Sequence, residues 1–87
     1  MSLKIITINI FDPTNRSSCI QQITEEDHIK LTDSTYLLHT SKSLDILRRE
    51  MAEYFDKTDT LFISKVPDKQ WISFHFGKHK SWVEENV

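Results

Sequence analysis

Residues 33–66 read DSTYLLHTSKSLDILRREMAEYFDKTDTLFISKV, and this stretch predicts a strand, a helix and a second strand in that order. The run 35–38 is rich in β-prone residues. Ser43 stands where the N-cap of a helix would lie. Four apolar residues then recur at helical spacing: Leu44, Leu47, Met51 and Phe55. A polar break follows, and the next strand is expected over 60–66.

The N-terminal run 4–11, KIITINIF, predicts a central strand, because its alternate isoleucines form one apolar face. It should end at Asp12 and Pro13, since proline lacks the donor of a strand ladder. Beyond it we expect a loop and then a short helix capped by Ser17 or Ser18, or a hairpin in place of that helix.

The remaining segments complete an α+β pattern. The run 28–40 predicts two strands separated by a bend, 70–76 a last strand, and 78–86 a helical turn. This order favours a ferredoxin-like antiparallel sheet with helices on one face and a short first helix.

Length allows one small domain, residues 1–87, in which only about 60 to 65 % of the unfolded chain's surface can be buried. A monomer of this size is marginally stable, so we expect a homodimer. Cys19 is the only cysteine, which excludes an internal disulfide and favours a cytoplasmic location. The apolar runs are too short to cross a membrane, so no membrane partner is expected.

Charge and glycine content limit the function classes. A net charge of −2 supplies no global basic field of the kind used for phosphate binding. Gly77 is the single glycine, which excludes nucleotide-binding loops that need several.

The order of segments over residues 33–86 resembles the SinR-like family of small bacterial proteins. The matching features are Asp-Ser-Thr before a strand, Thr-Ser-Lys-Ser at a helix entry, the Leu-Phe-Ile-Ser-Lys strand, Trp71, Gly77 and the closing Trp-Val-Glu-Glu-Asn. Those proteins look like relatives of the small nuclease-like subunit of the CRISPR adaptation complex and of the VapD ribonuclease toxins. The resemblance implies a ferredoxin-like fold. Residues 12–33 are a few residues shorter than in that pattern, in keeping with a short first helix.

Asp12 is the sharpest candidate for chemistry. The resemblance implies an acidic residue at the end of the first strand that binds a divalent metal across a dimer. Asp12 would then be both catalytic residue and metal ligand, with Mg²⁺ or Mn²⁺ as the cation. The alternative is a turn residue that accepts a hydrogen bond from Thr14 or Asn15.

Two groups of basic residues could contact phosphate or bases. The first is Arg16, Lys42, Arg48 and Arg49; the second is Lys78 and Lys80, beside His79 and Trp82. The alternative is that the arginines pair with Asp45, Glu50 or Glu53 on a solvated helix face, and that Trp82 is a core or interface anchor.

Two functions remain open. One is a catalytically silent dimeric module that binds nucleic acid, a nucleotide or a protein in defence or phage counter-defence. The other is a metal-dependent endoribonuclease that uses Asp12. A single carboxylate with few polar neighbours favours the first.

Overall fold

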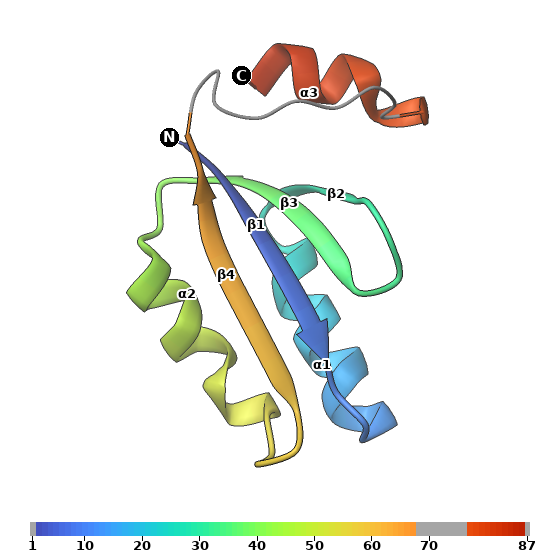
Figure 1. The fold of residues 1–87 in the computed structure, drawn as a ribbon, viewed down its shortest axis with the longest axis vertical. Helices are drawn as coiled ribbons and strands as arrows, with labels where there is room; N and C mark the ends of the chain where they lie inside the picture. Colours follow the sequence, from blue (N-terminus) through green and yellow to red (C-terminus); the bar gives the residue numbers. More distant parts are fainter. Residues whose placement is uncertain (1, 68–76, 87) are drawn as a thin grey trace.

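The part of the chain that the structure describes folds into a four-stranded sheet with three α-helices and two 3₁₀ turns (Figure 1). The computed structural model describes residues 2–67 and 77–86. Along the chain the elements are β1 (Ser2–Asn9), α1 (Pro13–Thr24), β2 (Asp27–Lys30), β3 (Thr35–Thr40), α2 (Leu44–Met51), η1 (Ala52–Tyr54), β4 (Thr60–Val66), η2 (Gly77–His79) and α3 (Lys80–Asn86).

The sheet has the strand order β2-β3-β1-β4, and every neighbouring pair is antiparallel. Strand β1 lies in the centre, with Ile6 opposite Tyr36 of β3 and Ile63 of β4. Strands β2 and β4 are the outer strands of this sheet as far as the chain is described. This small α+β architecture is compatible with a ferredoxin-like fold.

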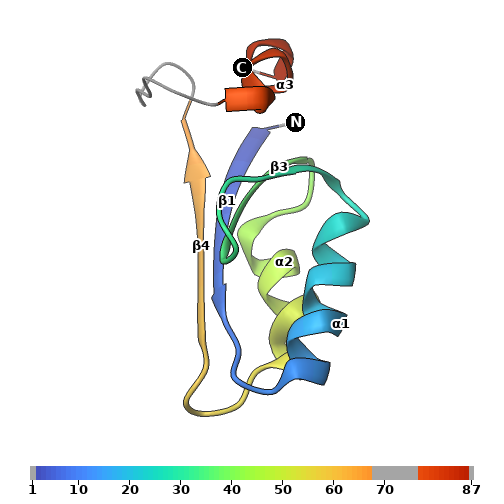
Figure 2. The ribbon, with the colours of Figure 1, turned by 90° about the vertical axis from the view of Figure 1, so that its right-hand side faces the viewer.

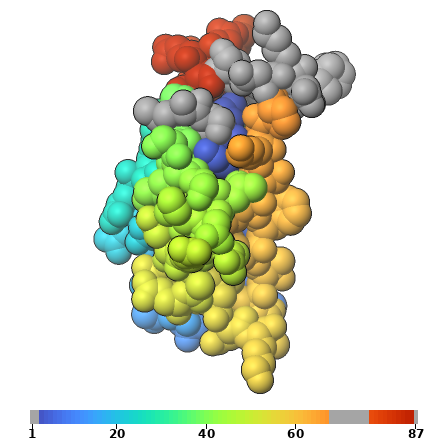
Figure 3. All heavy atoms as spheres, turned by 90° about the vertical axis from the view of Figure 1, so that its left-hand side faces the viewer, coloured from blue at the N-terminus to red at the C-terminus, as the bar shows by residue number. Residues whose placement is uncertain are grey.

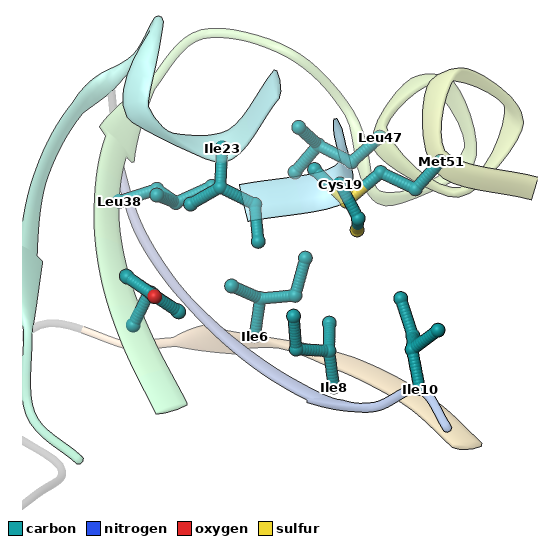
Figure 4. Close-up of a cluster of buried hydrophobic side chains, with 9 residues drawn as sticks. Ile6, Ile8, Ile10, Cys19, Ile23, Leu38, Leu47 and Met51 are labelled. Carbon is teal, nitrogen blue, oxygen red and sulfur yellow. The ribbon is translucent and has the colours of Figure 1, made fainter. Parts of the chain in front are cut away.

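Helices α1 and α2 cover the same face of the sheet (Figure 2). Alternate residues of β1 point toward them and form the main core with side chains of both helices (Figure 4). The core members labelled there are Ile6, Ile8, Ile10, Cys19, Ile23, Leu38, Leu47 and Met51. Leu47 and Met51, two of the four apolar residues that recur at helical spacing, are both buried in this core, so the predicted helix packs this side against the sheet.

The prediction of a short first helix is wrong. Helix α1 has 12 residues, against 8 in α2, and no hairpin replaces it. Its N-cap is Asp12 rather than Ser17 or Ser18, and Pro13 stands at the start of the helix. Proline is well suited to this position because its missing N–H would have no helical partner there. The helix therefore begins directly after β1, and the two serines lie inside it.

Helix α3 lies at the end of the sheet where β1 begins (Figures 1 and 2). It contributes Val83, 3 % exposed, to a second apolar cluster with Ile29 and Leu37. Leu37 alternates along β3 with the helix-facing Leu38, so this cluster covers part of the other sheet face. The sheet face that carries neither α1 nor α2 is thus partly covered by α3.

Most other expected boundaries agree with the structure. Strand β4 spans the expected 60–66, the run 28–40 splits into β2 and β3, and the C-terminal turn forms η2 and α3. Strand β1 ends at Asn9 rather than Phe11, and α2 passes into η1 after Met51. The strand expected at 70–76 lies outside the described residues. In the described parts of the chain, no helix is long and apolar enough to cross a membrane.

Candidate functional site

Asp12 serves as a helix cap at the exposed corner between β1 and α1. Its Oδ1 accepts a 2.9 Å hydrogen bond from the backbone N–H of Asn15, which is the alternative that the sequence left open for it. A second carboxylate, Asp59, lies at the same end of the sheet. Its two oxygens accept hydrogen bonds from the backbone N–H groups of Phe11, at 3.1 Å, and of Asp56, at 2.8 Å. Both carboxylates thus stabilise local backbone.

In the described part of the chain, the donor groups around Asp12 do not form a divalent-cation site. Mg²⁺ and Ca²⁺ take six or more oxygen ligands, of which a protein site usually supplies several. Within residues 2–67 and 77–86, no group of three or more His, Cys, Asp or Glu side chains could hold a metal ion.

The first basic group does not converge on one surface. The Nη2 atom of Arg16 donates to the backbone carbonyl of Asp33 at 2.8 Å. Arg48 and Arg49 both reach Asp45, at 2.7 and 2.8 Å, so the predicted pairing on the helix face is confirmed for that acid. Pairing with one carboxylate reduces the net positive charge that these two arginines could offer to a phosphate.

Lys42 belongs to a partly buried polar cluster that joins β3 and α2 to the chain after α1. Its ammonium donates to Glu50 at 2.9 Å and lies 3.4 Å from Glu26. Glu26 also accepts a 2.7 Å hydrogen bond from the Thr40 hydroxyl. The hydrogen bond to Glu50, together with the charge of Glu26, raises the pKa of Lys42 despite partial burial. The Lys42 side chain therefore holds two acids together and is poorly placed to bind an external anion.

The second basic group lies on η2 and α3. Lys78 and Lys80 are exposed, and Lys80 lies 3.8 Å from Glu84 one helical turn away. Trp82 is partly buried, and its indole N–H donates to Asp27 at 2.9 Å. The indole thus anchors α3 to β2, in agreement with the alternative that Trp82 is an anchoring residue and not a base-stacking one.

Sequence reasoning missed Lys4, which is 3 % exposed among the apolar residues of β1. Its Nζ donates to the backbone carbonyl of Thr40 at 2.9 Å. Side chains two residues apart lie on the same face of a strand, so the position of Lys4 relative to Ile6 and Ile8 could have predicted its burial. A lysine at the end of a strand is normally read as exposed, which hides that signal.

A groove of about 440 Å³ lies between α2 and β4. Figure 3 shows these two elements side by side on one face of the molecule. The groove is lined by three apolar residues of β4 and by three residues of α2: Leu61, Phe62, Ile63, Leu44, Asp45 and Arg48. Phe62 is 60 % exposed at this edge. No sequence motif marked the groove, because it depends on where α2 packs relative to an edge strand.

Comparison with known proteins adds no family assignment: no protein-family model matches the chain, and no curated protein is significantly similar to it.

Proposed function

We propose that this chain is a protein-binding module of ferredoxin-like fold that works as a homodimer. The order β1-α1-β2-β3-α2-β4, with both β-α-β units in one antiparallel sheet, supports the ferredoxin-like assignment. The small size of the chain supports a dimer.

The α2–β4 groove carries this proposal. Its strand side is apolar, and its helix side offers the Asp45–Arg48 ion pair at 2.7 Å. Exposed aromatic residues and arginines with an apolar floor are typical of protein interfaces. Because β4 is an edge strand among the described residues, an extended polypeptide can add to the sheet through backbone hydrogen bonds while its side chains enter the groove.

The charge distribution favours protein over nucleic acid or nucleotide. The arginines of α2 share Asp45, and Lys42 holds two glutamates. Binding of a nucleic-acid backbone needs several cations that can neutralise phosphates together. The net charge of −2 works in the same direction. A cytoplasmic setting in defence or counter-defence is part of the proposal, on the strength of the single cysteine and of the SinR-like resemblance.

Fluorescence anisotropy with three labelled probes tests the proposal. We expect extended apolar peptides, selected from a display library, to bind, and single-stranded RNA and ATP not to bind. Phe62→Ser should abolish peptide binding, whereas Phe11→Ser, which alters an equally exposed phenylalanine away from the groove, should not. The protein-binding proposal would be contradicted if the chain bound RNA, if Phe62→Ser kept that binding, and if an Arg48→Ala, Arg49→Ala double variant lost it.

A second candidate function is a metal-dependent endoribonuclease. The observation in its favour is the position of Asp12, an exposed carboxylate at the end of β1, where the SinR-like resemblance implies a metal-binding acid. The described residues of one chain supply no group of further ligands, so in this candidate a second copy would complete the site. A cleavage assay with Mg²⁺ or Mn²⁺ tests it, as argued below.

A further inference from the structure

Within the described residues, one side of β4 has no neighbouring strand, and we propose that a second copy of this chain pairs with it, β4 to β4 and antiparallel, about a two-fold axis at Phe62. This inference rests on the proposed function, because it names the protein that occupies the α2–β4 groove. Pairing would join two described four-stranded sheets into one continuous sheet of both copies.

The two edges of the sheet differ in a way that selects β4. Strand β2 has 4 residues, DHIK, with a charge at each end. Strand β4 has 7 residues, TLFISKV, with Lys65 as its one charged residue. Short, charged edges resist pairing with another chain, whereas long apolar edges favour it.

The sequence of β4 is self-complementary in one register. With the axis at Phe62, the residues opposite each other across the two copies are Phe62 with Phe62, Leu61 with Ile63, Thr60 with Ser64, and Asp59 with Lys65. Each pair keeps its side chains on one face of the sheet, as the two-residue period requires. Leu61 and Ile63 already contact the helix-facing core, so their pairing extends that core across the axis at the groove.

Neighbouring registers lose the charge match. An axis at Leu61 places Lys65 opposite Lys57 of the other copy, and like charges in opposite positions are destabilising. An axis at Ile63 places Lys65 opposite Leu61. Of these three registers, the one centred on Phe62 alone pairs opposite charges, and symmetry forms that pair twice.

Lys65 lies in a position that an acid from a second copy would improve. The register of β1 and β4 places it directly opposite the buried Lys4, so two ammonium groups share one side of the sheet. Burial and the charge of Lys65 lower the pKa of Lys4. The carboxylate of Asp59 is fixed next to the start of β4 by its two backbone hydrogen bonds, and the Phe62 register places this residue opposite Lys65 of the other copy.

This dimer has a consequence for Asp12. The two β1 strands would be separated by both β4 strands, a distance of about 14 Å for three strand spacings. Because the β1 strands also run in opposite directions, the two Asp12 residues that follow them would diverge from the axis. They could not share one cation, whose oxygen ligands lie at about 2 to 2.6 Å.

Disulfide trapping tests the interface in the whole chain. Phe62→Cys should form a covalent dimer on mild oxidation, since opposite residues of antiparallel strands have Cα atoms about 4.5 to 5.5 Å apart, within disulfide range. Lys30→Cys, exposed on the other edge strand, is the matched control and should not. The native Cys19 is fully buried and its pKa is raised to about 11, so the wild-type chain should stay monomeric on denaturing gels.

Lys65→Glu tests the register by light scattering and by urea unfolding under dilute, monomeric conditions. It should weaken the dimer about tenfold, because two attractive pairs become repulsive, yet stabilise the monomer by placing an acid opposite Lys4. Lys65→Arg should change neither. A dimer that Lys65→Glu leaves unchanged, or that Phe62→Cys does not trap, would overturn the edge pairing. A chain that is monomeric at all concentrations would overturn it too. Peptide binding to the groove, measured at dilutions where the chain is monomeric, decides the proposed function independently.

Discussion

The Nζ atom of Lys4 donates a 2.9 Å hydrogen bond to the backbone carbonyl of Thr40 across the β1–β3 pair. The side chain is buried on the helix-facing side of the sheet. Burial is the main cause of its lowered pKa, and the charge of Lys65 adds to it. A buried cation whose acceptor is a neutral carbonyl reduces stability at neutral pH, because the ammonium loses more hydration than one carbonyl replaces.

Lys4→Met should therefore be at least as stable as the wild type near neutral pH. The folded-state pKa of Lys4 lies below its ordinary value of 10.5. At pH values between these two pKa values, the folded protein therefore binds fewer protons than the unfolded chain. Wild-type stability from this group thus rises as pH rises toward 10.5, and the advantage of the variant should shrink. Urea unfolding at neutral pH and close to 10.5 measures this, with exposed Lys30→Met as control. An advantage independent of pH would contradict the argument.

Leu47→Ala should cost about 2 to 4 kcal/mol of unfolding free energy through lost burial and a residual cavity. Leu47 is fully buried between α2 and the sheet. Its neighbour Ile46 is 45 % exposed, so Ile46→Ala is the matched control and should cost less than about 1 kcal/mol. Thermal or urea unfolding compares the two. Equal losses would mean that α2 is rotated relative to the sheet.

The strands and α2 were predictable from sequence because their signals are local. Strand β4 lies between a polar break and Pro67, and Ser43 caps α2 through a 3.1 Å hydrogen bond to the Ile46 N–H. Helix α1 was not predictable to the same extent. Its cap, Asp12, was interpreted as the residue that ends a strand or as a catalytic acid. Its apolar residues form a weak helical pattern, and Cys19 and Ile23 are the two residues of the helix that are buried.

The candidate site shows what local patterns omit. Asp45 lies three and four residues before Arg48 and Arg49, so that pairing could be predicted from spacing. The cluster of Lys42 with Glu26 could not, because it joins residues that are neighbours only after β2 and β3 pair. The α2–β4 groove likewise depends on packing between elements.

Trp82→Phe should loosen α3 without unfolding the domain. The substitution removes the 2.9 Å hydrogen bond from the indole to Asp27 but keeps an aromatic ring against the second cluster. We expect a loss of about 1 kcal/mol and faster hydrogen exchange of the α3 amides. Glu85→Ala, at an exposed position of the same helix, is the control and should leave exchange unchanged. Equal exchange rates in all three proteins would show that the hydrogen bond does not hold α3.

Asp12→Ala should destabilise the fold by about 1 kcal/mol, because the N-terminal turn of α1 loses its side-chain cap. Asp12→Asn should remain within about 0.5 kcal/mol of the wild type, since asparagine caps a helix as well as aspartate. Urea unfolding of the three proteins tests this. Equal stability of Asp12→Ala and the wild type would show that the hydrogen bond to Asn15 contributes nothing.

The same pair of variants separates the two candidate functions. Since Asp12→Asn keeps the cap and removes the charge, any lost activity cannot be attributed to unfolding. As a protein-binding module, the wild type should not cleave RNA with Mg²⁺ or Mn²⁺, and Asp12→Asn should bind peptide as the wild type does. Metal-dependent cleavage abolished by Asp12→Asn would establish the endoribonuclease instead. Cleavage that survives Asp12→Asn would identify another site or a contaminant, because the one carboxylate proposed as metal ligand would be absent.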